Sequence, residues 1–144
     1  MTPPLAYIAA PFSDSSETIR SWHVARARLL ARLALATGYA PICVHGEIEA
    51  GTYGDDSDPE QRARGMAASA AICRGVLATP GAVLWALTND DGTMSAGVKA
   101  EVAIGHSGRR GRSWYTWAEW RESDELKRAA DLLPEWDRLA VRPD

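Results

Sequence analysis

The chain has few cysteines, no strong excess of charge of either sign and no hydrophobic run long enough to cross a membrane. Only two of its 144 residues, Cys43 and Cys73, are cysteines, which fits buried thiols in a reduced compartment better than a disulfide framework. Neither stands at a metal-ligand spacing, and we expect neither a metal nor a cofactor. The net charge of −3 gives no general attraction to nucleic acid.

The absence of a membrane-length segment favours a protein that does not enter a membrane. Residues 1–4 carry no signal-peptide pattern, so we expect a cytoplasmic location. Arg109, Arg110 and Arg112 form the one tight basic cluster, which we interpret as a solvated loop. A nucleic-acid polymer is therefore not an expected partner.

Apolar segments of strand length alternate with segments of helical periodicity. The patterns predict strands over 5–10, 39–44, 82–87 and 112–116, and helices over 18–36, 59–75, 96–106 and 118–139, the last interrupted by Pro134. Gly38 stands where a C-terminal cap belongs, and Asp58-Pro59-Glu60 has the form of a helix start. Between these elements, residues 46–58 are predicted to form a long exposed loop.

Uniformly apolar strands that alternate with helices, without hairpin signals, indicate a parallel sheet. We therefore predict an α/β fold: a doubly wound (flavodoxin- or Rossmann-like) parallel sheet of about four to five strands with helices on both faces. From the length of the chain we predict that residues 1–144 form one domain. Residues 113–144 are a Trp-rich C-terminal extension of it.

The segment Ser95-Ala-Gly-Val-Lys-Ala-Glu101 is the most informative part of the chain. It follows the predicted strand over 82–87 through a loop rich in turn-forming residues, and it opens a predicted helix. A strand, a small-residue turn and a helix start together form the place where open α/β sheets bind anionic or sugar ligands. Glu101 lies inside that helix among apolar neighbours, so it is a candidate reactive group.

Three segments leave the carboxyl ends of predicted strands, where ligands of such sheets bind. They span residues 10–14, 45–47 and 89–97. We expect them to converge on one cleft that contains Ser13, Asp14, His45, Ser95 and Glu101.

These pieces resemble the nucleoside 2-deoxyribosyltransferase-like superfamily over roughly residues 5–106. The matching motifs are Tyr7-Ile-Ala-Ala-Pro-Phe-Ser13, Pro41-Ile-Cys-Val-His45, Asp58-Pro-Glu-x-Arg62 and, most specifically, Ser95-x-Gly-x-x-x-Glu101 followed by Ala103 and Gly105. The resemblance implies that Glu101 is a nucleophile that attacks the anomeric carbon of a nucleoside and releases the base. A carboxylate can do so by forming a glycosyl ester, which water or another base then resolves.

The residue six positions before this Glu divides the superfamily. Transferases that act on free nucleosides resemble one another in having Asp there, whereas hydrolases of nucleoside 5′-monophosphates tend to have Ser, as this chain does at Ser95. A hydroxyl and the free N–H groups of a helix start donate to a phosphate, which an Asp would repel. We expect Ser95 and Gly97 to hold the phosphate, and Ala10, Pro11, Ser13, Asp14 and His45 to complete the substrate-binding site.

Other interpretations stay open for each of these residues. Glu101 could be an exposed helix residue, Ser95 a plain helix cap, His45 a partner of a loop carbonyl, and Ser13 and Asp14 the end of a strand and the cap of a helix. Asp55, Asp56 and Asp58 lack the full calcium-loop pattern, so a solvated loop with a cap is expected there.

The sequence departs from the superfamily at Ala70-Ala-Ile-Cys-Arg-Gly75, where an Asp that orients the base is usual. The leading hypothesis is hydrolysis of a nucleoside 5′-monophosphate. A non-catalytic nucleotide-binding or sensing protein and a base-exchanging deoxyribosyltransferase are the alternatives. The expected partner is a small nucleotide or nucleoside. Trp114, Trp117 and Trp120 are predicted to lie in the core or at a subunit contact. Aromatic clusters are typical of interface cores, and the resemblance implies a dimer or larger assembly, so we expect a homodimer or a larger homo-oligomer.

Overall fold

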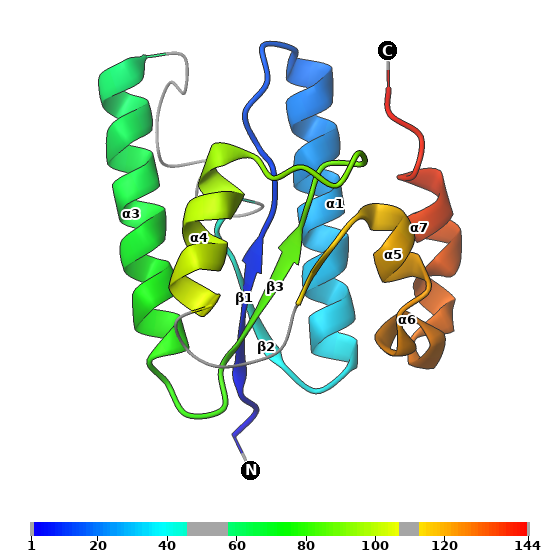
Figure 1. Ribbon diagram of the computed structural model, residues 1–144. Coiled ribbons are helices and arrows are strands. Elements are labelled where there is room, and N and C mark those ends of the chain that lie inside the picture. The colour runs from blue at the N-terminus through cyan, green and yellow to red at the C-terminus, as the bar shows by residue number, and fades with distance from the viewer. Residues whose placement is uncertain (1, 46–57, 107–112, 144) are drawn as a thin grey trace.

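The predicted parallel α/β architecture is confirmed. The computed structural model describes residues 2–45, 58–106 and 113–143. Four parallel strands in the order β2-β1-β3-β4 form one sheet, with helices on both of its faces (Figure 1). The strands are β1 (Leu5–Ala9), β2 (Ala40–Cys43), β3 (Val83–Leu87) and β4 (Trp114–Tyr115).

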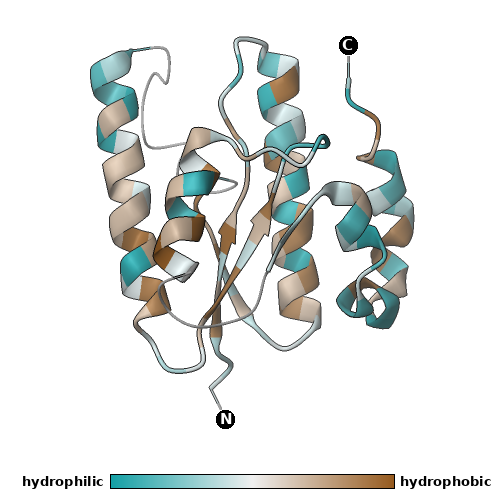
Figure 2. Cartoon of the chain, in the orientation of Figure 1, coloured by the Kyte–Doolittle hydropathy of each residue, from teal (hydrophilic) through white to brown (hydrophobic). Residues whose placement is uncertain are grey.

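Two helical layers cover this sheet. The helices are α1 (Glu17–Ala36), α3 (Pro59–Leu77), α4 (Ala96–His106), α5 (Trp117–Arg121), α6 (Asp124–Arg128) and α7 (Leu133–Arg138), with a 3-10 helix over Ala130–Leu132. Helix α1 and the C-terminal helices pack on one face, and α3 and α4 on the other (Figure 1). The strands carry the most apolar stretches and lie between these layers (Figure 2).

Alternation along β1 divides the core between the two layers. Ala6 and Ile8 pack with α1 and the C-terminal helices, whereas Tyr7 and Ala9 pack with α3 and α4. Because successive side chains of a strand point to opposite faces, a central strand covered on both sides must be apolar throughout. This explains why β1 reads as a continuous apolar run.

The predicted first and last residues of α1 and α3 lie close to the observed ones. Gly38 has φ 101° directly after α1, a backbone conformation that glycine adopts at little cost. The Asp58 side chain accepts from the Glu60 N–H and caps α3, and α3 continues past Gly75 to Leu77. The prediction of an exposed loop over 46–58 and of a solvated Arg109–Arg112 cluster falls mostly outside the described residues.

The prediction of a helical tail over 118–139 is confirmed, but the predicted interruption at Pro134 is wrong. The tail consists of three short helices and a 3-10 turn, because Thr116 and Ser123 each cap a new helix start. Pro134 lies in the first turn of α7, where a missing N–H costs nothing. It therefore begins a helix rather than interrupting one. The last strand is also shorter than predicted, at two residues.

The tryptophans of the tail belong to the core of the single chain. Trp117 and Trp136 stack with ring centroids 3.8 Å apart, and each indole N–H donates to the other residue's carbonyl. The Trp120 indole donates to the Ala86 carbonyl of β3. The interpretation of Trp117 and Trp120 as core residues is therefore confirmed, and the predicted homo-oligomer now rests on the family resemblance alone.

No helix in the described part of the chain combines the length and apolar character that crossing a membrane requires.

The contact between α4 and β3 generates a stability prediction. A Cβ at Gly105 would lie 2.7 Å from Leu84 Cδ2 and 3.3 Å from Leu84 Cβ, whereas a Cβ at Gly75 would meet nothing within 4 Å. Overpacking costs about 1–3 kcal/mol, and replacing a helical Gly by Ala returns up to about 1 kcal/mol. Urea unfolding should therefore show Gly105→Ala to be destabilised and Gly75→Ala to be as stable as the wild type or more so. Equal stability of the two variants would mean that α4 does not pack closely on β3.

Candidate functional site

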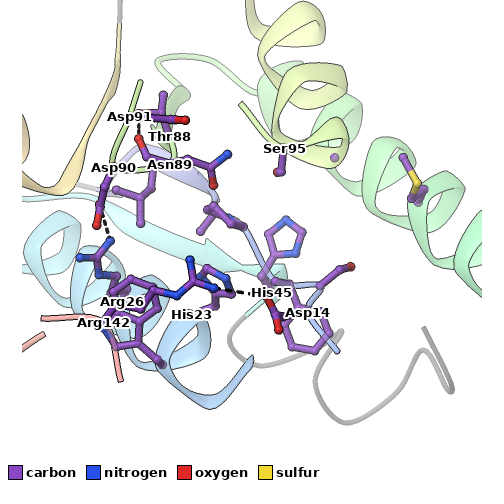
Figure 3. Close-up of a pocket in the computed structure, with 18 of the residues that line it drawn as sticks. Asp14, His23, Arg26, His45, Thr88, Asn89, Asp90, Asp91, Ser95 and Arg142 are labelled. Carbon is purple, nitrogen blue, oxygen red and sulfur yellow. Dashed lines mark hydrogen bonds and ion pairs between the residues drawn. The ribbon is translucent and has the colours of Figure 1, made fainter. Parts of the chain in front are cut away.

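A cleft of about 650 Å³ opens at the carboxyl ends of β1, β2 and β3 (Figure 3). This volume lies within the range of small-molecule sites. All seven residues predicted to bind substrate or phosphate line it: Ala10, Pro11, Ser13, Asp14, His45, Ser95 and Gly97. Three segments that are distant in the sequence therefore meet there, because parallel strands end at one edge of the sheet.

Glu101 is buried within α4, with 2% of its surface exposed. The Tyr7 hydroxyl donates to Glu101 Oε2 and also lies 3.3 Å from the Ser69 carbonyl. His45 Nε2 lies 3.1 Å from Glu101 Oε1. Both carboxylate oxygens are thus held by polar side chains, and the interpretation of Glu101 as a solvated helix residue is wrong.

The expectation that Glu101 itself lines the cleft is not met. His45 lines the cleft and touches Glu101, which lies behind it. The reason is helical geometry: Val98, Glu101 and Val102 share the face of α4 that is turned to the sheet, as a spacing of three to four residues requires. Ser95 and Gly97, at the start of the helix, remain beside the opening.

Ser95 caps α4 and also lies at the cleft. Its Oγ accepts from the Val98 N–H at 3.3 Å, as a helix cap does, and the residue also lines the cleft. A hydroxyl can cap a helix and donate its own proton to a ligand. The start of α4 therefore brings a hydroxyl and backbone N–H groups to one wall of the cleft.

Asp14 orders the turn between β1 and α1 while it lines the cleft. Its Oδ1 accepts from the Ser16 N–H at 2.8 Å, and its carbonyl accepts from Arg20 Nη1 at 2.5 Å. The side chain that caps α1 is that of Ser16, so the prediction that Asp14 caps this helix is off by two residues. Asp14 Oδ2 lies 3.6 Å from Arg142 Nη2 of the tail.

Sequence reasoning missed Arg26, which is 3% exposed and lies at the edge of the cleft. Its guanidinium lies 3.9 Å from the Trp22 ring centroid and 4.7 Å from that of Trp117. Its Nε donates to the Leu139 carbonyl at 2.9 Å, and its Nη1 pairs with Asp90 at the same distance. Burial lowers the pKa of Arg26, and Asp90 opposes that shift. The sequence did contain a signal for this burial: Arg26 lies on the apolar face of α1, four residues after Trp22.

Helix α3 places the thiol of Cys73 against α4. Cys73 Sγ lies 3.9 Å from the Glu101 carbonyl oxygen. Burial, and then the nearby Glu101, raise the pKa of the Cys73 thiol to about 12, so this thiol carries its proton at neutral pH. It packs against α4 and supplies no acid to the cleft.

Residues of metal-ligand type do not gather in the described ranges 2–45, 58–106 and 113–143: no group of three or more His, Cys, Asp or Glu side chains could hold an ion there. Asp58 caps α3. Asp55 and Asp56 lie outside those ranges.

A protein family described as a domain of unknown function (DUF7768) matches residues 4–110. The chain belongs to this family. No curated protein and no solved structure matches the chain. The part of the chain that matches DUF7768 contains Tyr7, His45, Ser95 and Glu101, whereas Arg142 lies beyond it.

The contacts of Arg26 predict a stability difference between two arginines of α1. Arg26→Met removes one of the two donors to the Leu139 carbonyl, which keeps the Trp22 indole N–H, and the partner of the half-exposed Asp90, so we expect a loss of about 1–3 kcal/mol. Arg28 is exposed on the same helix, and Arg28→Met should change stability by about 0.5 kcal/mol or less. Chemical unfolding of both variants measures the difference. Similar small losses would show that Arg26 does not hold the tail in place.

Proposed function

We propose that this protein hydrolyses the N-glycosidic bond of a nucleoside 5′-monophosphate and releases the free base and a sugar 5-phosphate. The observation that carries the proposal is the buried Glu101 carboxylate, held by Tyr7 and His45 directly behind the wall of a cleft. The cleft has the size of a small-molecule site, and one of its walls is the start of a helix.

The chemistry that this arrangement supports is nucleophilic substitution at the anomeric carbon. Glu101 would attack that carbon as the base departs, forming a glycosyl ester that water then cleaves. Two partners fix the orientation of the carboxylate, and such preorganisation lowers the entropic part of the barrier. The sugar has to reach Glu101 past His45, so the imidazole would have to turn as substrate binds.

The phosphate of the substrate is proposed to bind at the start of α4. Ser95 and Gly97 line the cleft there, and the positive end of the helix dipole favours an anion. Arg62 and Arg142 bring positive charge to the same cleft. Since no carboxylate stands at position 95, a dianion would meet no repulsion from that position.

A non-catalytic nucleotide-binding or sensing role is the second candidate. Two observations favour it: Glu101 does not line the cleft, and the 70–75 stretch of α3 carries no carboxylate. Base exchange between nucleosides is disfavoured by Ser95. On the family resemblance alone, we also propose a homodimer or larger homo-oligomer. The free, buried thiols of Cys43 and Cys73 support our proposal of a cytoplasmic location.

Glu101→Gln tests the nucleophile. The amide preserves the size of the side chain and leaves an oxygen for Tyr7, but it cannot form the glycosyl ester. Base release from a panel of nucleoside monophosphates, measured by chromatography, should therefore fall by at least about a thousandfold. Glu60→Gln changes an exposed carboxylate at the start of α3 and should retain the wild-type rate. A Glu101→Gln variant with more than about a tenth of the wild-type activity would remove Glu101 from this role, and a wild type without activity would favour the binding role.

Ser95→Asp tests the phosphate site. Both Asp and Asn can replace Ser as a helix cap, so Ser95→Asp and its control Ser95→Asn differ mainly in charge. We expect kcat/KM for the monophosphate to fall by at least tenfold more in the Asp variant than in the Asn variant, because like charges repel. The matching nucleoside should show no such difference. Equal turnover of nucleoside and nucleotide by the wild-type protein would contradict the assignment.

A further inference from the structure

The proposed hydrolysis needs a proton for the departing base, since a nucleobase anion is a poor leaving group and general acids assist such steps. The stretch of α3 from Ala70 to Gly75 has no carboxyl group. The proton therefore has to come from another side chain, and the described residues that line the cleft offer candidates.

The carboxyl groups among the described lining residues are those of Asp14, Asp90 and Asp91, and each already serves another contact. Asp14 accepts from the Ser16 N–H and faces Arg142, and Asp90 pairs with Arg26. Asp91 accepts from the N–H and hydroxyl of Thr93, which lowers its pKa. The side chains that contact the Glu101 carboxylate are instead those of Tyr7 and His45.

Two imidazoles also line the cleft, and they differ in their surroundings (Figure 3). His23 lies on α1, where burial and then Arg26 lower its pKa, so that the neutral ring is favoured. His45 follows β2, and its Nε2 lies 3.1 Å from Glu101 Oε1. His45 therefore joins the wall of the cleft to the carboxylate.

We propose that His45 is the catalytic acid and base of the reaction. This assignment rests on the hydrolysis proposed above. In the first half, a Glu101 oxygen bonds to the anomeric carbon, the bond from that carbon to the base nitrogen breaks, and a proton from the His45 imidazolium goes to the base. In the second half, neutral His45 takes a proton from water as the water oxygen bonds to the anomeric carbon. The ester bond then breaks and returns Glu101 as a carboxylate.

The separation of the two groups suits this chemistry. Enzymes that cleave glycosides through a covalent intermediate keep their two catalytic carboxyl groups about 5 Å apart. His45 Nε2 lies 3.1 Å from the carboxylate oxygen in the structure, and the turn of the imidazole that admits the sugar would widen this distance toward that separation. As Glu101 becomes an ester it loses its negative charge and its attraction for the imidazolium, which favours proton transfer at that moment.

The test compares two leaving groups in the first turnover of His45→Gln. A Gln amide keeps an N–H that can reach Glu101, but it cannot exchange a proton at neutral pH. One substrate is the nucleoside monophosphate that the wild type cleaves fastest. The other is a 4-nitrophenyl glycoside of the same sugar 5-phosphate, whose leaving group departs without a proton. His45→Gln should slow the first by at least about a hundredfold and leave the burst of nitrophenolate within a few-fold of wild type.

His23→Gln is the matched control, because it removes the other imidazole of the cleft and should change both rates in the same proportion. If His45→Gln slows both substrates equally, or leaves nucleotide cleavage within a few-fold of wild type, His45 is not the proton donor and the proposed hydrolysis still stands. If the wild-type protein releases neither base nor nitrophenolate, the proposed function fails and this inference fails with it.

Discussion

The burial of one carboxylate, Glu101, is the constraint on which the cleft depends. Moving an ionised carboxylate out of water costs several kcal/mol unless nearby groups compensate. Here the compensating groups come from two other elements: Tyr7 on β1 and His45 after β2. Tyr7 in turn contacts the backbone of α3 at Ser69. The contacts that stabilise the charge therefore fix how α3, α4 and two strands meet at the edge of the sheet. A hydrophobic residue would fill the same space without that cost, which is the physical reason to regard Glu101 as functional.

On the opposite face of the sheet, the buried guanidinium of Arg26 likewise holds several elements together. Arg26 lies between Trp22 and Trp117, donates to the Leu139 carbonyl and pairs with Asp90 in the loop after β3. The tail is thereby tied to the wall of the cleft. The two charges lie on different faces of the sheet, yet both act at the carboxyl ends of the strands. The residues that match DUF7768 supply the carboxylate side of the cleft, whereas the tail that Arg26 holds adds Arg142 to it.

The sequence predicted those parts of the structure that depend on local pattern. Apolar runs gave the strands, and the caps at Asp58 and Gly38 follow from side-chain and backbone preferences within a few residues. The convergence of Ser13, His45 and Ser95 follows from the parallel sheet. The depth of Glu101 could not be predicted in this way, since it depends on how α4 is rotated against β1. Arg26 was missed for a similar reason: Leu139 and Asp90, to which it donates, lie 113 and 64 residues away in the chain, and periodicity contains no information on such contacts.

The distribution of charge in the cleft bears on the kind of ligand that it can bind. Asp14 and Asp90 line the cleft, but each faces an arginine, Asp91 accepts two hydrogen bonds from Thr93, and the Glu101 carboxylate is held behind His45. Among the described residues, the walls can offer several donors to a ligand: the Ser95 hydroxyl, the start of α4 and the exposed Arg142. Arg142 lies at a longer distance from its carboxylate than Arg26 does from Asp90, so it is the easier of the two to redirect. A cleft of this composition suits a ligand with an anionic end, and the buried carboxylate beside it suits an electrophilic carbon. A sugar phosphate with a leaving group on its anomeric carbon has both.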